Sequence, residues 1–121
     1  MYVIMTSRTL ARKLAKVIVD HKGQDIVVLD FRKHSGFTDF FVICSGTSDR
    51  HVKAITDALD EELIKLKEKP IGREGYSLGH WSVLDYGNVV VHIFHALERK
   101  YYRLDQLWYD IPRISFKDIT V

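Results

Sequence analysis

Residues 81–94 read WSVLDYGNVVVHIF, a pattern typical of a β-hairpin. Both ends of this stretch are rich in the β-branched and aromatic residues that favour strands. Between them, Gly87 and Asn88 tolerate the positive φ angles of a tight turn. The stretch therefore predicts a strand over 81–85 and a hairpin partner over 89–94.

Further strands and helices are predicted on either side of this hairpin. Residues 25–30 (DIVVLD) favour a strand, and the continuous apolar run at 40–44 (FFVIC) favours a central strand covered on both faces. Residues 73–80 are predicted to be irregular or a short edge strand. Residues 98–109 predict one or two helical turns, because Pro112 prevents a longer helix.

Two amphipathic helices are predicted from apolar residues at helical spacing. The first covers 6–22, capped by Thr6 or Ser7. The second is capped by Thr47 or Ser48 and ends before Pro70 and Gly72. Its apolar positions are Val52, Ile55, Leu59, Leu63 and Leu66. The order of elements predicts an α/β (α+β) fold with a mixed sheet of four to five strands and helices packed on it.

Length and composition predict one domain over residues 1–121. The 46% hydrophobic and 28% charged fractions suit a globular chain, and the net charge of +2 is too small to indicate nucleic-acid binding. The single cysteine, Cys44, favours a reducing compartment. No apolar run reaches the roughly 20 residues that cross a bilayer, so we expect a cytoplasmic protein with no membrane partner.

Large aromatic and apolar side chains gather near the carboxyl end, together with Arg, and such residues carry binding energy at protein interfaces. The predicted partner-binding residues are Trp81, Val83, Phe94, Arg99, Tyr102, Leu104, Asp105, Leu107 and Trp108. Strand alternation puts Trp81 and Val83 on one face of their strand. Trp81 is buried if a helix covers that face and exposed if the face is open.

Catalytic and metal sites are less well supported by the sequence. The turn at 45–48 (SGTS) precedes a helix and could hold an anion, but it lacks the Lys and paired glycines of a phosphate loop. A nucleotidyltransferase also needs paired carboxylates for two metal ions, and no such pair follows. His92 and His95 point to opposite faces of one strand, so they do not predict a shared metal. We therefore expect no catalytic residue, metal or cofactor.

A basic stripe is predicted on the first helix, where Arg8, Arg12 and Lys16 recur at intervals of four. Such a stripe can contact phosphate or an acidic partner. Charged helix faces are more often simply solvated, and we favour that interpretation.

With these motifs in place, the chain resembles the ribosomal silencing factor family, also called RsfS or Iojap proteins. The resemblance covers residues 23–108. The matching pieces are TDFFVI at 38–43, SGTSDRH at 45–51, EG at 74–75, WSVLD at 81–85, VHIF at 91–94 and RKYYRLDQLW at 99–108. The family usually has Glu where this chain has Asp105. The negative charge is kept, but the side chain is one methylene shorter, so it reaches less far to form an ion pair.

The resemblance implies a non-catalytic factor with a nucleotidyltransferase-like fold. It implies binding to the large ribosomal subunit through its fourteenth protein, which blocks joining of the small subunit and represses translation. Homodimers are a further expectation, and direct contact with ribosomal RNA stays open.

Steric occlusion is the mechanism expected from this resemblance. Trp81, Tyr102 and Trp108 would anchor the factor, and Arg99 and Asp105 would orient the contact. Two alternatives are kept: a nucleotide-binding enzyme of nucleotidyltransferase type, and an RNA-binding module that uses the basic stripe.

Overall fold

The computed structural model describes residues 5–34, 36 and 38–119. Its strands are β1 (Gln24–Asp30), β2 (Phe40–Gly46), β3 (Gly72–Glu74), β4 (Trp81–Asp85), β5 (Val89–His95) and β6 (Arg113–Ile114). Its helices are α1 (Ser7–Asp20), α2 (Asp49–Lys65), α3 (Ala96–Tyr101) and α4 (Phe116–Ile119), with a 3₁₀ helix, η1, at Leu104–Trp108. The α+β class predicted from the sequence is confirmed.

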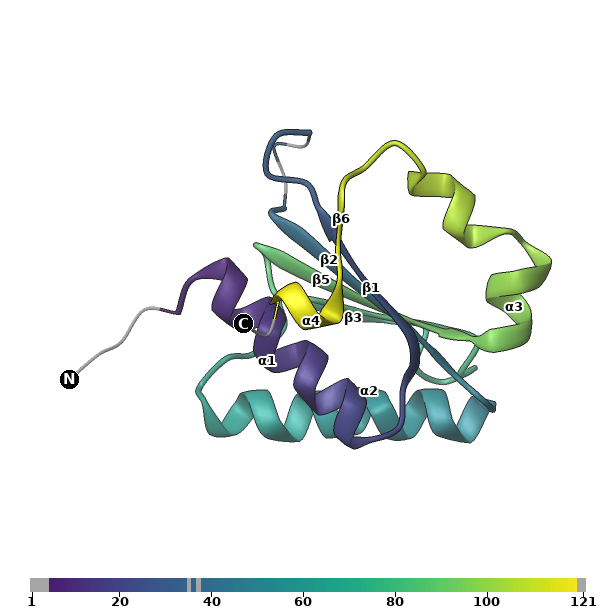
Figure 1. The fold of residues 1–121 in the computed structure, drawn as a ribbon. Helices are drawn as coiled ribbons and strands as arrows, with labels where there is room; N and C mark the ends of the chain where they lie inside the picture. The colour runs from purple at the N-terminus through teal and green to yellow at the C-terminus, as the bar shows by residue number, and fades with distance from the viewer. Residues whose placement is uncertain (1–4, 35, 37, 120–121) are drawn as a thin grey trace.

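One mixed sheet holds these strands in the order β3-β4-β5-β2-β1-β6. The central pair, β2 and β5, is parallel, and every other neighbouring pair is antiparallel. Helices α1 and α2 run beneath the sheet, and α3 lies to the right of the strands (Figure 1). The chain thus forms a layer of two long helices against one face of a sheet.

The two long helices begin at side-chain caps, as predicted. The Thr6 hydroxyl accepts a hydrogen bond from the amide of Thr9, and the Ser48 hydroxyl accepts one from the amide of His51. These bonds satisfy amide groups that have no partner within a helix. The structure therefore resolves the choice left by the sequence in favour of Thr6 and Ser48.

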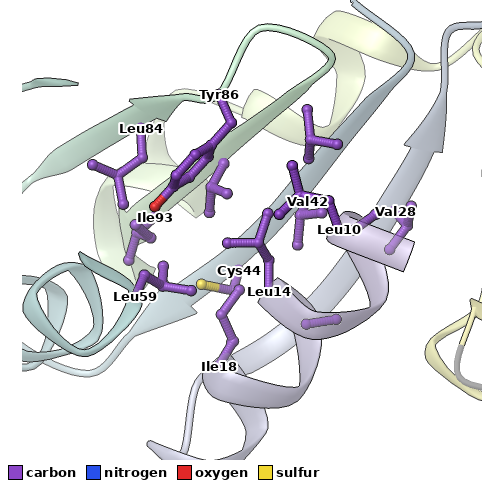
Figure 2. Close-up of a cluster of buried hydrophobic side chains, with 14 of the residues drawn as sticks. Leu10, Leu14, Ile18, Val28, Val42, Cys44, Leu59, Leu84, Tyr86 and Ile93 are labelled. Atoms are coloured by element: carbon purple, nitrogen blue, oxygen red, sulfur yellow. The ribbon is translucent and has the colours of Figure 1, made fainter. Parts of the chain in front are cut away.

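A hydrophobic core fills the space between the sheet and the two helices. Leu14 and Ile18 of α1 and Leu59 of α2 meet Cys44 of β2 and Leu84 of β4, and all five are fully buried (Figure 2). Because side chains alternate along a strand, the next residues of β2, β4 and β5 point to the opposite face of the sheet. That opposite face carries the candidate site.

The sheet has six strands in the described part of the chain, so the expectation of four to five was too low. β3 has three residues and β6 has two, and each pairs along an outer edge of the sheet. β3 overlaps the start of 73–80, where a short edge strand was one of the two predicted alternatives, whereas the two residues of β6 carry too little alternation to be recognised in sequence. The helical segment expected over 98–109 is also divided, because Arg103 adopts a left-handed conformation (φ 51°) between α3 and η1.

Candidate partner-binding surface

The face of the sheet away from α1 and α2 carries a set of rings in contact with one another. We call this set the aromatic face, and it consists of Phe41, Trp81, His92, Phe94 and Trp108. Trp81 of β4 lies directly across from Phe94 of β5, with ring centroids 4.9 Å apart. His92 contacts Phe41 at 4.5 Å and Trp108 at 5.6 Å between centroids. Three neighbouring strands and η1 therefore build one continuous aromatic layer.

His92 is the polar member of this layer, and the sequence did not single it out as a partner-binding residue. The indole N–H of Trp81 donates a hydrogen bond to Nδ1 of His92 at 3.1 Å. Burial lowers the pKa of His92 to about 4, because the apolar surroundings disfavour the charged imidazolium. The ring is therefore neutral near pH 7, with its proton on Nε2.

A buried arginine holds α3 and η1 against the sheet. The guanidinium of Arg99 donates to the Asp105 carboxylate at 2.9 and 2.8 Å, to the Ser45 hydroxyl at 2.9 Å and to the Asp25 carbonyl oxygen at 2.8 Å. The fork of the guanidinium suits several acceptors at fixed angles. The shorter side chain of Asp105 thus still reaches its cationic partner, and the contact fixes the segment that carries Trp108.

An apolar hollow of about 350 Å³ opens beside the aromatic face. It is lined by His80, Trp81, Phe94, Glu98, Tyr102 and Leu104. The carboxylate of Glu98 and the imidazole of His80 lie 3.9 Å apart. A hollow with apolar walls and ionisable groups among its lining residues can accept a large side chain from another protein.

Six of the nine residues predicted to bind a partner reach the surface. Trp81, Tyr102 and Leu107 are 41%, 62% and 58% exposed, and Asp105 is also exposed. Val83 and Trp108 are partly exposed. Of the two cases considered for Trp81, the structure shows the second: the face of β4 that carries it is open, and the side chain is exposed.

The remaining three, Phe94, Arg99 and Leu104, are buried, each 7% exposed or less. They are covered in the isolated chain, so a direct contact of these three residues with a partner stays a prediction. Phe94 lies against Trp81, and Leu104 packs with the apolar residues behind η1. They support the surface from beneath, because Arg99 and Leu104 point from the α3–η1 segment towards the sheet and Phe94 lies on the sheet under Trp81.

The turn at 45–48 acts as a helix start in this structure. Besides the Ser48 cap, the amide of Thr47 donates to Nδ1 of His51 at 2.9 Å. The carboxylates of Asp57 and Asp60 on α2 both bind Arg73, so they are paired with a cation. Among the described residues, no group of three or more His, Cys, Asp or Glu side chains is arranged to hold a metal ion.

Cys44 belongs to the core, as expected from its place in an apolar strand. Burial raises the pKa of its thiol to about 12, because the thiolate would be desolvated. On the basic stripe of α1, Arg8 donates a hydrogen bond to the carbonyl oxygen of Asp118 at 2.9 Å. Within the described ranges, the helices are too short or too polar to cross a membrane.

Comparisons with known proteins extend the resemblance to nearly the whole chain. Residues 4–121 match the family described as "Ribosomal silencing factor during starvation" (RsfS). The ribosomal silencing factor RsfS of Halalkalibacterium halodurans is 35% identical over 119 residues, covering 95% of this chain and 98% of that protein. A mouse relative named "Mitochondrial assembly of ribosomal large subunit protein 1" is 32% identical over 98 residues, covering 78% of this chain and 43% of that protein.

A solved structure shows the same fold. The crystal structure of a Chromobacterium violaceum protein superposes with a TM-score of 0.82 at 30% identity, covering 87% of this chain and 88% of that one. The likeness to nucleotidyltransferases expected from the sequence stays a prediction.

Proposed function

This chain belongs to the ribosomal silencing factor family, and on that premise we propose that it represses translation by docking on the large ribosomal subunit and blocking the small subunit. The contact is made with the fourteenth protein of the large subunit. Membership of the family supports ribosome-associated regulation of translation. A factor of this kind would act on cytoplasmic ribosomes and needs no catalytic group, metal or cofactor.

The observation that carries this proposal is a set of exposed apolar side chains on the aromatic face and on the α3–η1 segment beside it. Trp81, Tyr102 and Leu107 are large apolar side chains that remain 41–62% exposed in the isolated chain. Trp81 and Tyr102 line the same apolar hollow. Apolar groups that gather at a surface beside polar rims mark protein-binding sites. Tryptophan and tyrosine are also the residues that most often dominate the energy of such contacts.

Steric occlusion follows from the layered fold. The docking residues lie on one face of the sheet, and α1 and α2 lie on the other (Figure 1). When the aromatic face is seated on the large subunit, the helical layer projects away from the contact. A body of 121 residues then occupies space that the incoming small subunit would need. The mechanism therefore requires only binding.

The decisive experiment measures binding between this protein and the purified fourteenth protein of the large subunit, without RNA. Trp81→Glu should weaken that binding at least about thirtyfold, which is the effect of losing a hot spot of about 2 kcal/mol. Because Trp81 is 41% exposed, the variant is expected to fold. Circular dichroism and thermal unfolding check this.

Ile71→Glu is the matched control, because Ile71 is also a large apolar residue, is 77% exposed and is not part of the aromatic face or its hollow. It should bind as the wild type does. Folded Trp81→Glu protein that binds normally would contradict the proposed surface. Binding that requires ribosomal RNA would favour the RNA-binding alternative, and stabilisation by a nucleotide would favour the enzyme.

A further inference from the structure

A histidine in the centre of an aromatic sheet face needs an explanation. His92 is 7% exposed and is surrounded by Phe41, Trp81, Phe94 and Trp108. An aliphatic or phenyl side chain would fill this space without the cost of burying a polar ring. The imidazole must therefore supply something that an apolar side chain cannot.

The hydrogen bond from Trp81 identifies what it supplies. The Trp81 indole is partly exposed, yet its N–H group donates inward to Nδ1 of His92. Contact with Phe94, at 4.9 Å between centroids, fixes one side of the indole. The hydrogen bond fixes its direction, since only one rotation of the ring brings the N–H group to Nδ1.

The other nitrogen of His92 shows that stability alone does not account for this residue. With Nδ1 acting as acceptor, Nε2 carries the proton. Nε2 is buried and has no hydrogen-bond partner within the described part of the chain. An unpaired buried donor destabilises a fold. The imidazole is thus kept at a cost, and the one hydrogen bond that its side chain makes among the described residues is the one that orients Trp81.

We propose that His92 is a positioning residue that holds the Trp81 indole in the orientation required for docking. This inference rests on the proposed function, because the orientation matters only if Trp81 is an anchor. A tryptophan that is already oriented loses less conformational freedom when it binds, and this preorganisation strengthens the contact. His92 itself need not touch the partner.

A matched pair of variants separates positioning from packing. Asparagine and leucine are similar in size and shape, and both place a terminal atom near the position of the histidine Nδ1. His92→Asn can present its amide oxygen there as an acceptor, whereas His92→Leu presents a methyl group. We expect His92→Leu to bind the fourteenth protein of the large subunit about fivefold more weakly, and His92→Asn to recover most of that loss.

The orientation of Trp81 is measured separately in the free protein. Replacing Trp108 with Phe leaves Trp81 as the only tryptophan, so time-resolved fluorescence anisotropy reports the mobility of its indole. His92→Leu should give a faster and larger loss of anisotropy than the parent and His92→Asn. Wild-type protein adds a test that needs no substitution: the Trp81 indole proton should exchange slowly with solvent although the residue is 41% exposed.

Each outcome either supports or overturns the inference. Rapid exchange of the Trp81 indole proton, or an equally rigid Trp81 in His92→Leu, would overturn it. So would equal weakening of binding by both substitutions with no change in anisotropy, because the role would then be packing. If the wild type itself does not bind, the proposed function fails, and the exchange and anisotropy measurements still test whether His92 holds Trp81.

Discussion

At the scale of single residues, His92 couples the stability of the fold to pH. Burial lowers the pKa of His92 from its ordinary value of 6.5 to about 4. As the pH falls, His92 therefore becomes protonated in the unfolded chain before it does so in the folded protein. The free energy of unfolding should fall as the pH drops from about 6.5 towards 4. The loss in the free energy of unfolding approaches about 3 kcal/mol, because each unit of difference between the unfolded and folded pKa of His92 corresponds to about 1.36 kcal/mol.

Urea unfolding at pH 7 and at pH 4.5 measures this loss. His92→Asn lacks the titrating group, so its free energy of unfolding should change less between the two pH values. The other ionisable groups are shared by both proteins and cancel in the comparison. An equal change in the two proteins would mean that the His92 ring is not held neutral by burial.

Arg99 gives a second prediction at this scale. Arg99→Leu removes a buried cation and leaves the Ser45 hydroxyl and the Asp25 carbonyl oxygen without this donor. We expect a loss of about 3 kcal/mol in the free energy of unfolding, because these two acceptors lose a charged donor at a site shielded from water. Asp105→Asn should cost less, about 1 kcal/mol, because the amide oxygen can still accept from the guanidinium and the side chain at this position is 56% exposed.

Thermal or urea unfolding of the two variants checks this asymmetry. Equal losses in both would indicate that the ion pair, and not the arginine's contacts with Ser45 and Asp25, holds η1 in place. Binding provides a further readout. Arg99→Leu should also weaken docking, because η1 carries Trp108.

The candidate residues show how far sequence can predict a surface. The residue types at 81–108 indicated an interface, and strand alternation placed Trp81 and Val83 on one face. Exposure could not be predicted, because Phe94 and Leu104 are buried in the same apolar cluster, and the path that brings Leu104 there depends on the Arg99 contacts and the left-handed Arg103. His92 was missed although the hairpin was predicted, because the register that brings His92 within reach of Trp81 was not part of that prediction.

At the scale of elements, the Ser48 cap of α2 should be worth about 1 kcal/mol. Ser48→Ala removes the hydroxyl that accepts from the His51 amide and leaves that amide without a side-chain partner. Thr47→Ala is the comparison, because the Thr47 hydroxyl lies 3.2 Å from Nδ1 of His51 but does not cap the helix. Denaturant unfolding should show the larger loss in Ser48→Ala. A larger loss in Thr47→Ala would mean that the helix begins one residue earlier.

Elements with long periodic patterns were predicted well. The expected helix over 6–22 and the expected strands over 25–30, 40–44, 81–85 and 89–94 all correspond to observed elements within a few residues. The two-residue β6 and the single turn of α4 were missed. Their positions are fixed by contacts with β1 and α1 that lie more than 80 residues away in sequence, so no local pattern predicts them.

At the scale of the whole molecule, the strand order could not be derived from the sequence. β2 pairs in parallel with β5, although about 40 residues separate them. A hydrophobic run such as 40–44 predicts a central strand but does not name its neighbours. The position of the helical layer could not be derived either. Amphipathic patterns show that α1 and α2 each bury one side, but they do not show which face of the sheet that side packs against.

Charge distribution over the whole molecule provides the last prediction, which concerns salt. A net charge of +2 and an apolar docking face predict that binding to large subunits depends weakly on ionic strength. An RNA-binding module that used Arg8, Arg12 and Lys16 would release counterions from about three phosphates. The logarithm of its binding constant would then fall with the logarithm of salt concentration at a slope of about −2 to −3.

Cosedimentation with large subunits at increasing salt measures that slope, which should be shallower than about −1 if the aromatic face makes the contact. The double variant Arg12→Glu/Lys16→Glu tests the same point without changing the buffer. Both residues lie on α1, which packs on the face of the sheet opposite Trp81, so the double variant should bind within about twofold of the wild type. A steep slope that this variant abolishes would move the contact from the aromatic face to the helices. In that case the helical layer would contact the large subunit, and the sheet would be the part of the protein that blocks the small subunit.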